Sequence, residues 1–205
     1  MLNIFEGCTG LTSVILPESV RSINFRAFYG CSNLKSIKMP SHLETIGQNA
    51  FTRCVKLNDV QIPNSVTAIS HGAFNGCLAL TSFDIPESVT SLGDYFIDGC
   101  SAMTDLYVHH TTPILIEENT FIENTQQQVT LHVPSGSKEK YSSTPYWKGF
   151  SKIIDDIEDS GISSATTDKE NVRIYDLRGH RCDRPQRGIN IIRRSDGTTR
   201  KEIVR

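Results

Sequence analysis

Apolar residues return along this chain with a period of 23 positions. Phenylalanine recurs at Phe5, Phe28, Phe51 and Phe74, and each lies three positions ahead of a cysteine. A segment that repeats at a fixed interval is one supersecondary unit, which cannot bury its apolar face alone and must stack on its neighbours. The pattern therefore predicts a repeat solenoid.

The other apolar positions keep the same period and give the unit C-x2-L-x2-V-x-L-P-x2-V-x2-I-x3-A-F-x2-C. The spacing L-x2-V-x-L turns three apolar side chains inward from a short strand. Proline ends that strand because it fixes φ and lacks an N–H. We therefore expect one main strand per coil, a second short extended segment after the proline, and a tight helical turn at A-F-x2-C.

The repeat resembles the BspA-like subclass of bacterial leucine-rich repeats, whose signature is L-x2-I-x-L-P followed by I-G-x2-A-F-x2-C. Residues 4 to about 108 carry the match, with Gly47 and Gly93 at the signature glycine and Asn24 and Ser70 in the same column. The resemblance implies a leucine-rich-repeat solenoid, β-rich with short helical turns. It also implies adhesion to host extracellular or cell-surface proteins, sometimes to other bacteria.

The period is lost after Val108, and the next residues predict a cap. Residues 129–134 have the pattern of a final strand, 136–141 of a turn, and 147–150 of a short aromatic helix. We expect Trp147, Tyr146 and Phe150 to cover the last apolar layer, which places the solenoid and its cap at 1–154, with the cap from about 109. Residue 1 falls in mid-repeat, so we expect either upstream coils or self-association with a second copy at this uncapped coil.

Residues 155–171 are acidic and then small and polar, which predicts a linker.

Residues 172–205 carry ten Lys or Arg against four Asp or Glu. Apolar and polar residues alternate in this segment, which predicts a small β domain with strands at 172–179, 188–192 and 201–205 and a hairpin at Asp196-Gly197. The runs around Tyr175, Gly179, Gly188 and Gly197 resemble the C-terminal sorting domain of type IX secretion substrates, although Asn190 stands where that family has tyrosine. The alternative is a β module that only closes the protein. Nucleic-acid binding is not favoured, because no aromatic residues interleave the arginines.

Six cysteines raise the alternatives of disulfides and metal binding. Five of them occupy one column of the repeat, Cys8, Cys31, Cys54, Cys77 and Cys100, where stacked side chains point in parallel. We therefore expect a ladder of buried free thiols and suspect Cys182, outside the ladder, of being exposed and reactive.

Candidate catalytic and metal-binding patterns are absent from the sequence. No C-x2-C pair has zinc spacing, and the adjacent His109 and His110 point to opposite sides of a strand. No G-x-S-x-G motif, phosphate-binding glycine loop or H-E-x2-H motif occurs. We expect no metal, no cofactor and no enzymatic activity.

What remains is the outer face of the stacked strands, which is the candidate ligand-binding face. It comprises Ser13, Ile15, Ser36, Lys38, Asp59, Gln61, Ser82, Asp84, Asp105 and Tyr107. This mixed polar strip suits a protein or glycan better than a polyanion.

The sequence therefore predicts a secreted or surface-displayed module that binds a host extracellular-matrix or cell-surface protein or a glycan. The alternative is a structural spacer, or a scaffold for a missing N-terminal domain. No apolar run approaches the ~20 residues that span a bilayer, and no signal peptide is visible in this chain, so an extracellular or outer-surface location requires one elsewhere.

Overall fold

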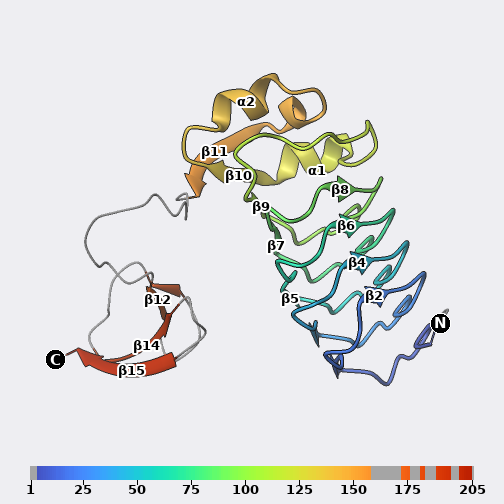
Figure 1. Ribbon diagram of the computed structural model, residues 1–205. Helices are drawn as coiled ribbons and strands as arrows, with labels where there is room; N and C mark the ends of the chain where they lie inside the picture. The colour runs from blue at the N-terminus through green and yellow to red at the C-terminus, as the bar shows by residue number, and fades with distance from the viewer. Residues whose placement is uncertain (1–3, 158–171, 176–180, 183–187, 195–198, 205) are drawn as a thin grey trace. The chain divides into compact units, whose positions relative to one another are not determined.

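A computed structural model describes residues 4–157, 172–175, 181–182, 188–194 and 199–204. The chain divides into two compact units, residues 1–160 and residues 161–205. The first is a solenoid of stacked coils that ends in a cap (Figure 1). Within the described residues, no helix is long and apolar enough to cross a membrane.

One parallel strand per coil forms the main face of the solenoid. β1 (Ser13–Ile15), β3 (Ser36–Lys38) and β5 (Asp59–Val60) make one sheet, in the order β1-β3-β5. β7 (Ser82–Ile85), β9 (Asp105–Val108), β10 (Thr130–Pro134) and β11 (Lys152–Ile157) make a second, in the order β11-β10-β9-β7. Ser13 pairs with Ser36 and Ser82 pairs with Asp105, so neighbouring coils are in register at the sequence period.

The second extended segment of each coil forms a third parallel sheet. Its strands are β2 (Ser22–Ile23), β4 (Thr45–Ile46), β6 (Ala68–Ile69) and β8 (Ser91–Leu92), in the order β2-β4-β6-β8. The prolines end the main strands as expected, because the carbonyl of Pro40 accepts the N–H of Leu43 at 3.2 Å and the carbonyl of Pro63 accepts that of Val66 at 3.0 Å. These bonds close the turn from the first sheet to the third.

The A-F-x2-C segment differs from the predicted helical turn. It is a chain of single turns, in which the N–H of Cys54 bonds to the carbonyl of Phe51 at 3.1 Å, while alternate N–H groups bond to the next coil. For example, the N–H of Phe28 donates to the carbonyl of Ala50 at 2.8 Å. A helix would use these groups internally, so the stacking of coils decides the conformation. Gly47 fits because a Cβ there would lie 2.8 Å from the carbonyl oxygen of Ile23.

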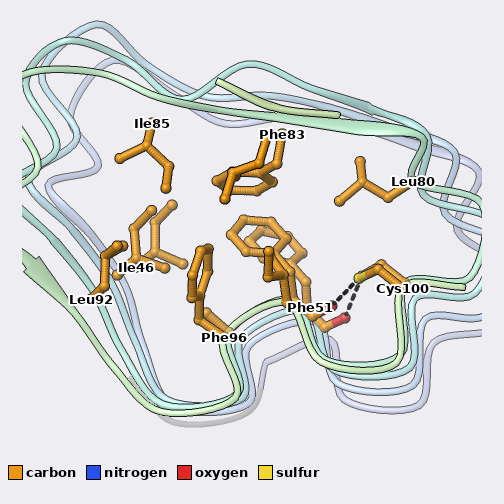
Figure 2. Close-up of a cluster of buried hydrophobic side chains, with 14 of the residues drawn as sticks. Ile46, Phe51, Leu80, Phe83, Ile85, Leu92, Phe96 and Cys100 are labelled. Atoms are coloured by element: carbon orange, nitrogen blue, oxygen red, sulfur yellow. Dashed lines mark hydrogen bonds between the residues drawn. The ribbon is translucent and has the colours of Figure 1, made fainter. Parts of the chain in front are cut away.

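The core runs along the solenoid between the sheets. The rings of Phe5, Phe28, Phe51 and Phe74 stack in a column with centroid separations of 5.3, 5.3 and 5.0 Å. Figure 2 shows Phe83 and Ile85 entering this core from one side and Ile46 and Leu92 from another. Phe96 stands in the alanine column and meets Phe83 edge to face, so the stacked column changes to edge-to-face packing toward the cap.

The cap contains α1 (Glu123–Gln128), β10, α2 (Lys138–Ser143), the 3-10 helix η1 (Trp147–Gly149) and β11. Trp147 and Phe150 are buried as predicted, but Tyr146 is 41% exposed and the prediction for it was wrong. Tyr141 fills the place instead, and its hydroxyl donates to the carbonyl of His110 at 2.8 Å. Tyr146 has a positive φ of 65° at the start of η1.

The predicted linker begins too early, because β11 continues through Ile157 and pairs with β10. Pairing of Pro134 with Ile157 across a register shift holds the acidic stretch at 155–156 in the sheet. Residues 158–171 of the predicted linker lie outside the described residues.

The second unit is an antiparallel sheet of four strands in the order β13-β12-β14-β15. They are β12 (Val172–Tyr175), β13 (Arg181–Cys182), β14 (Gly188–Arg194) and β15 (Thr199–Val204). The three predicted strands are present with shifted ends, while the two-residue β13 was too short to give a pattern. Gly179 and Asp196-Gly197 lie outside the described residues, as does the side chain of Cys182.

Candidate functional site

The outer side of the main strands carries the ten residues predicted to face solvent. The inward residues of the same strands, among them Ile37, Phe83 and Leu106, are buried. Of the ten outward residues, the exposed ones are Ser13, Ile15, Lys38, Asp59, Gln61, Ser82 and Asp84, and the half-buried ones are Ser36, Asp105 and Tyr107. Alternation of inward and outward side chains along a strand therefore generates this strand face.

Strand pairing arranges these side chains in two rows across the coils. One row joins Ser13, Ser36 and Asp59 and, in the second sheet, Ser82 with Asp105. The other joins Ile15 with Lys38 and Asp84 with Tyr107, and Gln61 follows β5 in the same column. Each row thus presents one side chain per coil, spaced by the ~4.8 Å between paired strands.

The strand face continues onto the cap, which the sequence prediction missed. β10 places Thr130 beside Asp105 and His132 beside Tyr107, and β11 places Lys152 beside Thr130. The signal was present, because residues 130–134 repeat the spacing of residues 105–108 and end in proline like the main strands. Aligning these residues with the repeat would have placed Thr130 and His132 on the outward side.

His132 is the centre of a charged cluster on this face. Its Nε2 lies 2.9 Å from Oδ1 of Asp105, and its Nδ1 lies 2.9 Å from both carboxylate oxygens of Asp156. The ring of Tyr107 stacks on the imidazole with a centroid separation of 4.4 Å. Each imidazole nitrogen therefore has a carboxylate within hydrogen-bond distance.

The cluster favours the charged form of Asp105. Partial burial opposes ionisation of this carboxyl, but hydrogen bonds from Thr104 and His132 and the charges of His132 and Lys152 outweigh it and hold the pKa of Asp105 below its ordinary value. One coil earlier, Nε2 of His109 lies 2.6 Å from Oδ1 of Asp84. The C-terminal half of the strand face therefore pairs aspartates with histidines.

The histidines of the described residues bear on the expectations for metal binding. No group of three or more His, Cys, Asp or Glu side chains among them is arranged to hold a metal ion. His109 and His110 do point to opposite sides, since His110 is 7% exposed while His109 is half-buried and contacts Asp84. Burial lowers the pKa of His110, so this ring is neutral and structural.

The cysteine column is a ladder of free thiols, as predicted. Cys31, Cys54, Cys77 and Cys100 are buried and Cys8 is half-buried. Each buried thiol donates to a phenylalanine carbonyl 26 residues earlier, and Figure 2 shows one such bond at Cys100. Burial raises the pKa of Cys54 to about 12, with the neighbouring Cys31 adding to the effect. These thiols therefore stabilise the stack rather than react.

Comparison with known proteins agrees with this arrangement of coils. The model of the BspA type leucine rich repeat region matches residues 2–131 in six copies. The structure of the leucine rich repeat protein TpLRR from T. pallidum is 33% identical, with 53% of this chain and 51% of that chain covered and a TM-score of 0.51. The pneumococcal vaccine antigen PcpA shares the fold at 23% identity, with 70% and 41% covered and a TM-score of 0.57.

The chain thus spans about half the length of these two structures or less. No curated protein matches the sequence. The family match covers most of the chain and coincides with the solenoid and the first strand of its cap. This protein therefore belongs to the family of BspA type leucine rich repeat proteins.

Proposed function

We propose that this chain is a cell-surface or secreted binding module that recognises a host protein or glycan through the strand face. The observation that carries the proposal is the continuation of polar, outward side chains over the strands of both main sheets and onto the cap. Membership of the BspA type family supports a binding role at the bacterial surface. The printed description of PcpA as a vaccine antigen is in keeping with surface exposure of a protein of this fold.

The chemistry of the strand face suits a polar partner. Lys38 and Ile15 lie beside each other at the N-terminal end, while Asp59, Asp84 and the His132 cluster lie toward the cap. A partner with basic or hydroxyl groups opposite these carboxylates would gain charge-assisted hydrogen bonds and would displace little apolar surface.

The test is a binding screen of the purified chain against immobilised matrix proteins, mucins and glycans at physiological salt. Saturable binding should be lost in a variant of the strand face, K38A/D59A/Q61A/D84A. The matched control R21A/E44A/T67A/E87A changes exposed residues outside the strand face, three of them next to the third sheet, and removes the same charges. Equal binding by both variants would place the ligand elsewhere.

The second candidate is a structural spacer or scaffold for another domain. It is favoured by the regular, mostly hydrogen-bonded stack of coils, which gives a stiff rod without requiring a ligand. Absence of saturable binding to every partner in the screen, with both variants folded, would favour this candidate over the binding module.

We further propose that the second unit acts in sorting to the outer surface. The resemblance at Tyr175, Gly179, Gly188 and Gly197 and the four-stranded sheet support this proposal. Deletion of residues 172–205 in a host with type IX secretion should leave the protein inside the cell envelope. Unchanged surface display of the deletion variant would contradict it.

A further inference from the structure

A pocket of about 270 Å³ opens on the cap, away from the residues assigned to the strand face above except for Lys152. It lies among α2, η1 and β11. Its lining residues are Lys138, Ser142, Lys148, Phe150, Ser151, Lys152 and Ile153. Segments 138–143 and 147–153 thus bring three lysines to one place, although the whole chain has a net charge of −2.

The three ammonium groups lack anionic partners within the described part of the chain. None of Lys138, Lys148 and Lys152 forms an ion pair there, and only Lys152 influences a carboxyl, that of Asp105. Glu139 follows Lys138 on α2 but does not line the pocket. Three like charges around one hollow repel each other, and an anion that enters the hollow relieves this repulsion.

The hydroxyls of Ser142 and Ser151 supply hydrogen-bond acceptors beside the lysines. Oγ of Ser142 donates to the carbonyl of Lys138 at 2.9 Å, and Oγ of Ser151 donates to the carbonyl of Gln127 at 3.1 Å. Because each hydroxyl proton is engaged, its oxygen is left to accept a hydrogen bond from a ligand. The pocket therefore combines cationic donors for an anion with neutral acceptors for hydroxyl groups.

We propose that this pocket binds a sugar that carries sulfate or phosphate ester groups. Lysine ammonium groups bind tetrahedral phosphate or sulfate groups as point charges. The serine oxygens accept the remaining sugar hydroxyls. This proposal rests on the proposed function, because it names the class of glycan that the chain recognises. It places that glycan in the cap pocket and not on the strand face.

The experiment is calorimetric titration of the full chain at physiological salt. The probes are a sulfated disaccharide, the same disaccharide without sulfate, its phosphorylated form, and sodium sulfate. The pocket variant is K138Q/K148Q, which leaves Lys152 and Asp105 unchanged. The matched control K35Q/K56Q removes two exposed lysines from the solenoid.

Binding of one or both esterified sugars should be saturable, and the better of the two identifies the ester. The Kd should rise at least about tenfold in K138Q/K148Q and less than about twofold in K35Q/K56Q. The proposal is overturned if neither esterified sugar binds, or if the unesterified sugar or sodium sulfate binds as tightly as the esterified sugar. Equal loss of affinity in both lysine variants would also overturn it.

The strand-face variant K38A/D59A/Q61A/D84A separates this proposal from the proposed function. It should keep its affinity for the esterified sugar while losing the macromolecular partner found in the screen. Loss of sugar binding in the strand-face variant would show that the pocket is not the site. Failure of the screen with retained sugar binding would instead remove only the strand-face function.

Discussion

The thiol of Cys54 donates a hydrogen bond over 3.1 Å to the carbonyl oxygen of Phe28, which lies in the preceding coil. The same oxygen accepts the backbone N–H of Cys31 at 3.1 Å. One carbonyl therefore joins a turn of its own coil to the cysteine of the next. This relationship explains why a small residue with a donor occupies that column.

Replacing Cys54 with alanine should lower the free energy of unfolding by about 1–2 kcal/mol. The loss combines a small cavity with the missing thiol bond, while the Phe28 carbonyl keeps its bond to Cys31. Urea unfolding measures the change. Cys8 is half-buried, and C8A should cost less than about 0.5 kcal/mol. Equal losses at the two positions would contradict the role assigned to the ladder.

Alkylation should distinguish the thiols in the native protein. Only the thiolate reacts, and burial raises the pKa of Cys54 to about 12, so this thiol should resist iodoacetamide at pH 8. Among the five thiols of the ladder, mass spectrometry should find Cys8 modified first and Cys54 modified only in denaturant. Alkylation of Cys54 as fast as Cys8 under native conditions would show that the coils open.

The stacked phenylalanine column should be the costliest place to truncate. Phe51 is fully buried between the rings of Phe28 and Phe74. F51A should reduce the free energy of unfolding by about 3–5 kcal/mol. Phe25 is 36% exposed and outside the column, and F25A should cost less than about 1 kcal/mol by the same denaturant measurement. Similar costs would mean that the stacked column contributes no special stability.

Gly47 should not tolerate a side chain. A Cβ would lie 2.8 Å from the carbonyl oxygen of Ile23 and 2.9 Å from the carbonyl carbon of Asn24, both backbone atoms of the preceding coil. G47A should therefore separate these coils and lower the free energy of unfolding by ~1–3 kcal/mol. The melting temperature should fall by several degrees. A Cβ at Gly10 meets nothing within 4 Å, so G10A is the control and should leave the melting temperature nearly unchanged.

Stability should fall in mildly acidic solution because of His110. Burial, which outweighs the opposite effects of Val89 and Glu87, lowers the pKa of His110 below the ordinary 6.5. As the pH falls below about 6.5, the unfolded chain therefore binds a proton that the folded chain excludes, and the free energy of unfolding decreases. Asp105 adds a separate loss only below about pH 3.8, since its pKa is lowered from that value.

Denaturant unfolding between pH 7 and pH 5 measures the slope due to His110. It should be smaller in H110L, which removes the titrating ring but keeps the backbone carbonyl that Tyr141 binds. The control H42Q changes an exposed histidine and should keep the slope of the unchanged protein. An unchanged slope in H110L would assign the pH dependence to other groups.

The sequence by itself determined the coil. Its period fixes which side chains stack, and inward residues such as Leu34 and Ile37 had to be apolar because every coil buries them against two neighbours. The outward positions of the strands followed from the same alternation. The cap strand β10 was also visible, because residues 130–134 repeat the pattern of the main strands.

Only the tertiary structure decided which side chains meet from elements that are distant in sequence. His132 meets Asp105 and Asp156 because β9, β10 and β11 pair in parallel, and no local pattern links residues 24 to 27 positions apart outside the regular repeat. The turn segment likewise bonds alternate N–H groups to the next coil, which overrides the helical turn that its local sequence suggests. Periodic burial can be inferred from one coil, whereas irregular contacts in the cap depend on long-range pairing and on the exclusion of Tyr146 from its core.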